Sequence, residues 1–168
     1  MVKNKRFLMF LALAALLALL FAQAVSQESP APQVTFTSLK GEKIPMLSLR
    51  GKVVLVNFWA TSCTGCIHEM PQIIDTYRKY QTQGLETIAV AMSYDPPNYV
   101  VNYTEKNALP FKVALDVQGN IAQAFGDVKL TPTTFIIDKR GNIIKRILGE
   151  PDFAQLRTLL EKELQAAV

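Results

Sequence analysis

Residues 57–71 read NFWATSCTGCIHEMP and contain both cysteines of the 168-residue chain, Cys63 and Cys66. The apolar, β-branched run 52–58 leads into this stretch. It is too short for a helix and does not alternate, so it predicts a central strand buried on both faces. Apolar residues then recur at helical spacing over 64–82. The two cysteines are therefore expected where a buried strand gives way to a helix.

Short strands and helices alternate around this motif. Gly84 is expected to end the helix, and the apolar run 85–92 predicts a second buried strand, which completes a β-α-β unit. Asn98 and Asp152 are the expected N-caps of two later helices. The pattern predicts an α/β fold in which a mixed sheet is flanked by helices. The other expected elements are hairpins over 34–38/43–47 and 133–138/143–148, a strand over 111–115, and helices over 98–107, 119–125 and 152–166.

The amino-terminal residues 1–24 are expected to direct export. Three basic residues precede an apolar run over 7–22, whose 16 residues lie between the length of a cleavable signal core and that of a comfortable membrane span. A small-x-small pattern ending at Ala24 favours cleavage there, whereas the length of the run allows retention as a membrane anchor. Either alternative places the protein in the periplasm or at the outer face of the cytoplasmic membrane.

The rest of the chain is expected to form one domain, 34–168, after a flexible, proline-containing linker over 25–33. The formal net charge is +4. Three of the 18 basic residues and none of the 14 acidic ones lie in the leader, so 15 basic against 14 acidic residues leave a net charge of +1. A nucleic-acid partner would need a clustered basic excess, which this sequence does not show.

The spacing of the cysteines argues against three kinds of site. A disulfide staple between residues three apart closes almost no loop and therefore contributes little chain entropy. A zinc site needs four ligands, whereas the chain offers two cysteines and one histidine. A c-type haem site needs a histidine directly after the second cysteine, but Ile67 intervenes before His68. No metal and no cofactor are therefore expected.

A working dithiol is the interpretation that the spacing favours. Cys63, at the start of a helix, would meet unpaired backbone N–H groups and the positive end of the helix dipole, both of which favour a thiolate. Cys66 lies one turn deeper, within reach of the first sulfur. This arrangement suits disulfide exchange, in which Cys63 attacks a partner's disulfide and Cys66 resolves the mixed disulfide.

The helical wheel separates the two polar residues that follow the cysteines. His68 lies about 200° from Cys66 and is expected to be a solvated surface residue. Glu69 lies about 60° from Cys66, at the margin of the apolar stripe. A partly buried carboxyl has a raised pKa and could take the proton of Cys66. The alternative is an acid of the first turn that the helix dipole favours, and periodicity alone leaves both open.

Three separated stretches carry a family resemblance. Residues 58–71, together with LRGKVVLVN over 49–57, resemble the active-site region of the exported thioredoxin-like proteins of the TlpA/ResA group, whose usual motif is W-A-x-W-C-x-P-C-x-x-E-x-P. Downstream, FGDVKLTPTTFIID over 125–138 is similar to the cis-proline loop and the closing hairpin of that group. The resemblance covers roughly residues 34–166 and implies a thioredoxin-like fold with an N-terminal β-hairpin.

The resemblance also implies roles for individual residues. Pro132 would be a cis-proline facing the dithiol, and the backbone of Thr131 would offer hydrogen bonds to an extended substrate strand. Glu69 matches the acid that the group places near its cysteines, which favours a proton relay. Trp59 is expected to pack beside the dithiol and is a candidate for substrate binding. The stretch 94–115 corresponds to a central insertion, which either shapes partner choice or merely packs.

Two departures from related patterns bear on the chemistry. The cytoplasmic thioredoxin pattern has a buried aspartate where this chain has Asn57, which cannot titrate, so a buried base would have to be Glu69. Between the cysteines, Thr64 and Gly65 lack the usual proline, and Ser62 stands where tryptophan is common. Because C-x-x-C proteins span reduction potentials from about −270 to about −120 mV, this dipeptide is expected to affect the redox poise.

The resemblance implies a protein thiol:disulfide oxidoreductase that exchanges disulfides with partner proteins. Members of the group often act as reductases, in cytochrome c maturation among other processes, with electrons from a membrane donor. A thiol peroxidase is one alternative, although Thr61 stands two rather than three residues before Cys63. A non-catalytic module, such as a Cu(I) chaperone, is the other, since two thiols at this spacing could pass that metal.

Overall fold

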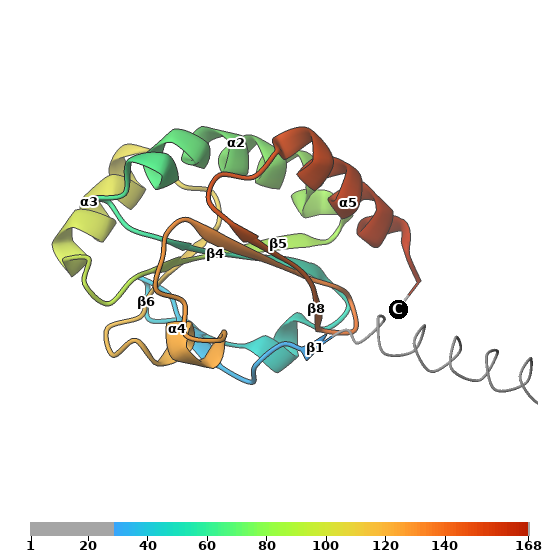
Figure 1. The fold of residues 1–168 in the computed structure, drawn as a ribbon, viewed down its shortest axis with the longest axis horizontal. Helices are drawn as coiled ribbons and strands as arrows, with labels where there is room; N and C mark the ends of the chain where they lie inside the picture. Colours follow the sequence, from blue (N-terminus) through green and yellow to red (C-terminus); the bar gives the residue numbers. More distant parts are fainter. Residues whose placement is uncertain (1–28, 168) are drawn as a thin grey trace, which may run out of the picture.

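The computed structural model describes residues 29–167, which form a six-stranded sheet with helices on both of its faces (Figure 1). The strands of the sheet are β1 (Ser29–Pro30), β4 (Val53–Trp59), β5 (Leu85–Ala91), β6 (Lys112–Leu115), β7 (Thr133–Ile137) and β8 (Asn142–Leu148). They lie in the order β1-β8-β7-β4-β5-β6. β4, β5 and β6 run parallel, while β7, β8 and β1 pair in antiparallel fashion. The predicted mixed sheet is thus confirmed.

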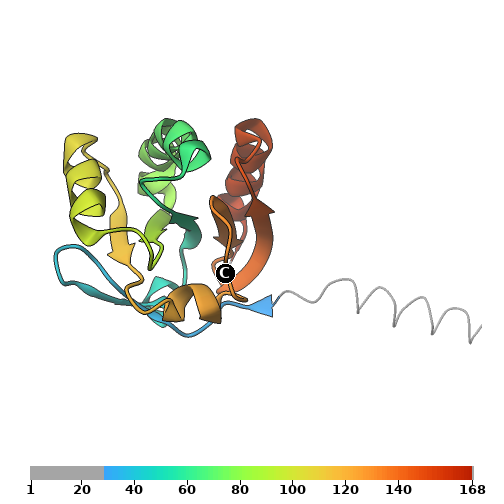
Figure 2. The ribbon, with the colours of Figure 1, turned by 60° about the vertical axis from the view of Figure 1, so that its left-hand side comes forward.

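The helices are distributed unequally between the two faces of the sheet (Figure 2). Three longer helices cover one face, and a short helix covers the other together with the N-terminal hairpin. The helices are α2 (Thr64–Tyr80), α3 (Pro97–Lys106) and α5 (Phe153–Gln165) on the first face and α4 (Asn120–Ala124) on the second. The hairpin strands are β2 (Thr35–Thr37) and β3 (Lys43–Pro45), and the 3₁₀ turns are η1 (Met46–Leu49) and η2 (Gln81–Gln83).

The central strand β4 is buried along its whole length and pairs with β5 on one side and β7 on the other. Its side chains alternate between two cores. Phe58 packs edge-on against Phe125 and Phe135, with ring centroids 5.4 and 5.9 Å away. Trp59 points to the opposite face, into a core that includes Cys66. The loop that carries the cysteines therefore leaves a strand that is held on both edges and both faces.

Part of the expected flexible linker takes part in the sheet. Ser29–Pro30, within the expected flexible linker 25–33, pairs with the edge strand β8 opposite Ile143 and its neighbour. Ala31 is only 3% exposed, and its N–H donates to the carbonyl oxygen of Gly141 at 2.9 Å. The described fold thus includes Ser29–Pro30 and Ala31 ahead of the expected start at Val34, because β8 offers an open edge that these residues cover.

The expected export segment lies outside the described residues. This applies to the apolar run 7–22 and to the cleavage point after Ala24. Within the described part of the chain, 29–167, no helix combines the length and the apolar character needed to cross a membrane.

The helix ends test three further predictions. Asp152 caps α5 as expected, accepting from two backbone N–H groups at 2.9 and 3.1 Å. Gly84 has a φ of +103° and closes the turn that follows α2, as predicted. The predicted N-cap Asn98 is wrong, because α3 begins at Pro97 with Pro96 at the cap position. A proline needs no N–H partner at the first position of a helix, and its fixed φ suits that position, so the helix starts earlier.

Candidate active site

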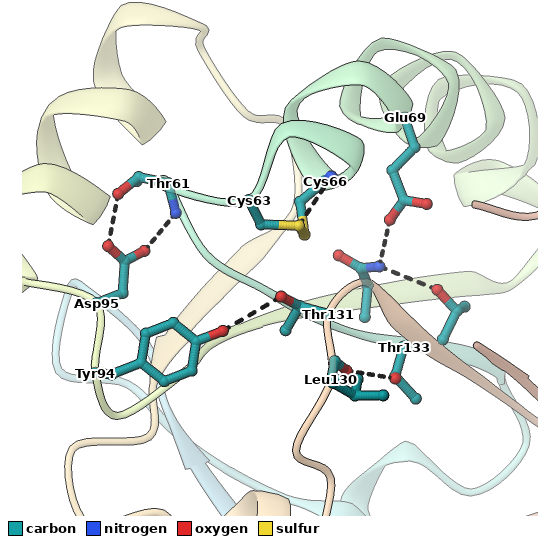
Figure 3. The surroundings of a disulfide bond; sticks show 11 residues. Thr61, Cys63, Cys66, Glu69, Tyr94, Asp95, Leu130, Thr131 and Thr133 are labelled. Atoms are coloured by element: carbon teal, nitrogen blue, oxygen red, sulfur yellow. Dashed lines mark hydrogen bonds between the residues drawn. A yellow bond between two sulfur atoms is a disulfide. The ribbon is translucent and has the colours of Figure 1, made fainter. Parts of the chain in front are cut away.

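Cys63 and Cys66 form a disulfide at the N-terminus of α2, where the loop from β4 enters the helix (Figure 3). Their Cα atoms are 5.2 Å apart. Cys63 is the N-cap residue of α2, and its Sγ accepts from the backbone N–H of Cys66 at 3.1 Å. Cys66 has no exposed surface, whereas Cys63 is half-buried. Of the two sulfurs, that of Cys63 is accessible to another protein, and on reduction it lies at the positive end of the helix dipole.

Glu69 is buried on α2, one helical turn after Cys66, rather than at the margin of the apolar stripe. Its side chain is almost fully inaccessible, and it lies beyond the first turn of α2, which contains no acidic residue. Oε1 accepts a hydrogen bond of 2.8 Å from Nδ2 of Asn57, which also donates to Oγ1 of Thr134 at 3.0 Å. Oε2 has no hydrogen-bond partner among the described residues. The alternative of a first-turn acid stabilised by the helix dipole does not fit this position.

The surroundings of Glu69 favour its protonated form near neutrality. Burial raises the pKa of Glu69 from its ordinary value of 4.5 to about 7. The hydrogen bond from Asn57 lowers this pKa, and the negative charge of Glu150 raises it again. Because Asn57 is neutral, it can stabilise the carboxylate only through one N–H group. A carboxyl with a pKa of about 7 both accepts and donates protons at neutral pH.

The peptide bond between Thr131 and Pro132 is cis, as the family resemblance implies. Pro132 is buried, and its Cδ lies 3.6 Å from the position that a Cβ on Gly65 would occupy. The proline therefore packs against the turn between the two cysteines. Oγ1 of Thr131 lies 3.2 Å from the hydroxyl oxygen of Tyr94, whose side chain is largely exposed at the same edge (Figure 3). The segment 94–115 thus reaches the cis-proline loop.

Trp59 does not occupy a position from which it could bind substrate. It has no exposed surface, and its ring packs against Tyr103 of α3 with centroids 5.2 Å apart. It shares a hydrophobic core with Cys66 and Met70. The expectation that Trp59 packs beside the dithiol agrees with this placement, whereas its candidacy for substrate contact is contradicted by its burial.

Asp95 is a residue of the site that sequence reasoning missed. It is 4% exposed, and its two carboxylate oxygens accept from Thr61, at 2.6 Å from the backbone N–H and at 2.5 Å from Oγ1 (Figure 3). These bonds attach the loop two residues before Cys63 to the loop that follows β5. The available signal was an acid in the loop after a second parallel strand, since the carboxyl ends of parallel strands lie at the same edge of the sheet.

Glu150 is the second residue that was missed. It follows β8, and its carboxylate lies close to Gly65 in the turn between the cysteines. Nδ1 of His68 lies 2.6 Å from Oε2 of Glu150, and the side chain of His68 is 78% exposed. The predicted outward orientation of His68 is confirmed, although the residue is paired rather than merely solvated. No local pattern links 68 with 150, which are 82 positions apart.

The described side chains around the disulfide do not form a set of metal ligands. In the part of the chain that the structure describes, no group of three or more histidine, cysteine, aspartate or glutamate side chains is placed to hold a metal ion. The acidic residues of the site are engaged instead with Asn57, Thr61 and His68.

These features define a class of protein. A C-x-x-C pair at the N-terminus of a helix, a buried carboxyl below it, a cis-proline against it and this mixed sheet are together the arrangement of thioredoxin-fold dithiol proteins. Residues 26–160 match the family model of Redoxin, so the chain belongs to the Redoxin family.

Individual relatives narrow the class. The thiol-disulfide oxidoreductase ResA of Bacillus thuringiensis subsp. konkukian is 40% identical over 133 residues, which cover 79% of this chain and 75% of the relative. The solution structure of a provisionally named thioredoxin from Neisseria meningitidis superposes with a TM-score of 0.77 at 38% identity, covering 83% of this chain and 93% of that chain. A thiol:disulfide interchange protein from Chlorobium tepidum gives 0.75 at 26% identity, with coverages of 83% and 98%. The protein is a thiol-disulfide oxidoreductase of the ResA type.

The raised pKa of Glu69 predicts a pH-dependent stability. The folded protein keeps the Glu69 proton up to about pH 7, whereas the unfolded chain loses it near pH 4.5. The stabilising contribution of this proton is therefore complete below about pH 4.5, falls as the pH rises, and is lost above about pH 7. Relative to Glu69→Gln, the free energy of unfolding of the oxidised wild type should fall by ~3 kcal/mol over this range.

Urea unfolding of the oxidised proteins between about pH 4.5 and pH 8 measures this difference. Glu105→Gln is the matched control, because it removes an exposed carboxylate from α3. If wild type and Glu69→Gln change in parallel with pH, Glu69 does not titrate near neutrality in the folded protein.

Proposed function

We propose that this protein is an extracytoplasmic reductase of protein disulfides that uses Cys63 and Cys66 as its redox couple. The observation that carries the proposal is the asymmetry of the pair. Cys63 is half-exposed at the positive end of α2, while Cys66 is buried one helical turn before Glu69, a buried carboxyl with a pKa of about 7. One sulfur is thus placed to meet a partner and the other to complete the reaction.

Exchange follows from this asymmetry in two steps. The Cys63 thiolate attacks one sulfur of the partner's disulfide, a mixed disulfide forms, and the other partner sulfur leaves as a thiolate that takes up a proton. Cys66 then attacks Sγ of Cys63 in the mixed disulfide and releases the remaining partner sulfur. Two electrons pass to the partner, and the product is the Cys63–Cys66 disulfide that the structure contains.

Glu69 is proposed to accept the proton of Cys66 in the second step. A buried thiol ionises reluctantly, because burial disfavours the charged form. A neighbouring carboxylate with a pKa of about 7 is matched to receive that proton at neutral pH. Asn57 would act as the positioning residue, since its Nδ2 holds Oε1 of Glu69 and leaves Oε2 available.

The partner strand is proposed to lie along the loop of Thr131 and Pro132. This loop packs against the turn between the cysteines, and its edge also carries Tyr94. An extended segment placed there could pair with the backbone of Thr131, which brings a disulfide of the partner to Cys63. Protein thiols and disulfides are the substrates that such a surface fits.

Export and a membrane electron donor complete the proposal. A reductase outside the cytoplasm must be re-reduced after each turnover, and the amino-terminal leader would place the domain beside a donor in the membrane. Reduction of apocytochrome c before haem attachment is the process that the family resemblance suggests. The direction of electron flow rests on that resemblance, since the relatives' names state disulfide exchange without a direction.

Thr61 does not favour the peroxidase alternative. A peroxidatic site needs a threonine hydroxyl directed at the attacking sulfur, but both polar groups of Thr61 are bonded to Asp95. We therefore retain disulfide exchange as the proposed activity.

Trapping of partners tests the roles of the two cysteines. Cys66→Ser should accumulate mixed disulfides through Cys63, because the resolving thiol is missing. Cys63→Ser should trap no partner and lose insulin-reducing activity, since the buried Cys66 cannot reach a substrate. Non-reducing electrophoresis and an insulin-turbidity assay measure both effects. Full activity in Cys63→Ser, or equal trapping by both variants, would defeat the proposal.

The reduction potential tests the direction of electron flow. Equilibration with glutathione or dithiothreitol buffers should place the couple below about −200 mV, in the range of reducing C-x-x-C proteins. A value near −120 mV, typical of strong oxidants, would instead make the protein a donor of disulfides.

A further inference from the structure

Glu150 extends over the turn between the two cysteines from the loop that follows β8. Its Oε1 lies 3.2 Å from the position that a Cβ on Gly65 would occupy. Contacts of a real Cβ are rarely that close, so any other residue at 65 would push this carboxylate away by a few tenths of an ångström. The glycine between the cysteines therefore allows the carboxylate its close approach to the turn. Proline, the usual residue at this position in the resembling group, would hinder that approach.

His68 holds the other oxygen of Glu150. Its Nδ1 lies 2.6 Å from Oε2, and because a carboxylate can only accept, this ring nitrogen carries the hydrogen of the bond. Residues three apart on a helix are neighbours on its surface, so Gly65 and His68 form one patch of α2. One oxygen of the Glu150 carboxylate thus lies near Gly65 in the dithiol turn. The other is bonded to His68, the only histidine of the chain.

The backbone beside Glu150 is tied to the cis-proline loop. The N–H of Gly149 donates to the carbonyl oxygen of Pro132 at 2.9 Å. Gly149 has a φ of +82°, a conformation that glycine adopts without strain. The backbone next to Glu150 is therefore held by the cis-proline loop, and the side chain of Glu150 is held by His68 of α2. The side chain of Glu150 remains 42% exposed, so its charge faces a docking partner as well.

The negative charge of Glu150 acts on another ionisable group of the site. It raises the pKa of the buried Glu69, which lies one helical turn beyond Cys66. A negative charge near a thiol disfavours the thiolate in the same way as it disfavours a second carboxylate. The other acidic groups around the turn, Glu69 and Asp95, are buried and bonded to neutral partners.

We propose that Glu150, held over Gly65 by His68, is a second acidic residue of the dithiol site, and that its charge opposes formation of the Cys63 thiolate. The residue does not touch the reacting sulfurs and is a positioning and electrostatic element. Destabilising the thiolate destabilises the reduced protein relative to the disulfide, so the couple becomes a stronger reductant. The inference rests on the proposed reductase function and offers a reason for glycine at 65.

The test is Glu150→Gln, which retains the size of the side chain and removes its charge. The acid dissociation constant of the Cys63 thiol, from the pH dependence of its alkylation in the reduced protein, should rise about threefold. Where the thiolate predominates, the reduction potential should rise by the equivalent of about 14 mV, since a tenfold change in the equilibrium constant corresponds to about 30 mV. Both differences should shrink at high salt, because the carboxylate is partly exposed.

Glu105→Gln is the matched control, since it removes one exposed carboxylate from α3 and should leave the Cys63 thiol unchanged. Gly65→Ala tests the geometry, because its added methyl group would meet Oε1 of Glu150. The effect of Gly65→Ala on the Cys63 thiol should differ between wild type and Glu150→Gln, as expected for coupled residues.

Three results would overturn the inference: an unchanged thiol in Glu150→Gln, an equal change in Glu105→Gln, or an effect of Gly65→Ala that is the same in both backgrounds. None of these would affect partner trapping by Cys66→Ser. Conversely, loss of the proposed exchange function would show in the trapping assay, whereas the thiol titration needs no partner. The two failures are therefore distinguishable.

Discussion

The burial of β4 on both faces and both edges is the constraint on which the site depends. All seven of its residues are inaccessible, and it pairs with β5 and β7 along its length. The loop that leaves it is held again by Asp95 before it reaches Cys63. A rigid strand end followed by a helix start places one sulfur at the surface and the other in the core. Pre-organisation of this kind keeps the reacting atoms in position without cost at the moment of reaction.

The buried carboxyl of Glu69, one helical turn after Cys66, is the second determinant of the chemistry. The strand position that carries a buried aspartate in the cytoplasmic thioredoxin pattern is Asn57 here, and the titrating group has moved to Glu69 on the facing helix. Asn57 donates to Glu69 instead of titrating itself. The carboxyl that gains and loses a proton therefore lies on α2, the helix that carries the cysteines. Burying this group opposes folding once it is ionised, which is a common feature of functional sites.

Much of this arrangement follows from local pattern. The apolar run 52–58 predicts the buried strand, and the helical wheel places Glu69 about 60° from Cys66, at the margin of the apolar stripe. The cis bond before Pro132 could be predicted only through the family resemblance, since an isolated proline is rarely cis. The structure around the motif can thus be predicted from the sequence, because its residues lie within a few helical turns of one another.

Other features depend on contacts between distant parts of the chain. Asp95 lies 34 positions from Thr61, and Glu150 lies 82 positions from His68, so no periodicity connects either pair. The strand Ser29–Pro30 has two residues and no apolar pattern, and it exists because β8 offers it an edge. The burial of Trp59 likewise follows from α3, which covers it. Tertiary packing decides these positions, and local sequence does not encode it.

The central claim, that Glu69 takes the proton of Cys66, is tested most directly by the pH dependence of mixed-disulfide resolution. Trp59 is the only tryptophan and shares a core with Cys66, so its fluorescence can follow the reaction in a stopped-flow experiment. The wild-type rate should rise with an inflection near pH 7, and Glu69→Gln should be slower by about tenfold or more, with its inflection moved above about pH 8.5 because Cys66 is buried. Superimposable profiles for the two proteins would contradict the account.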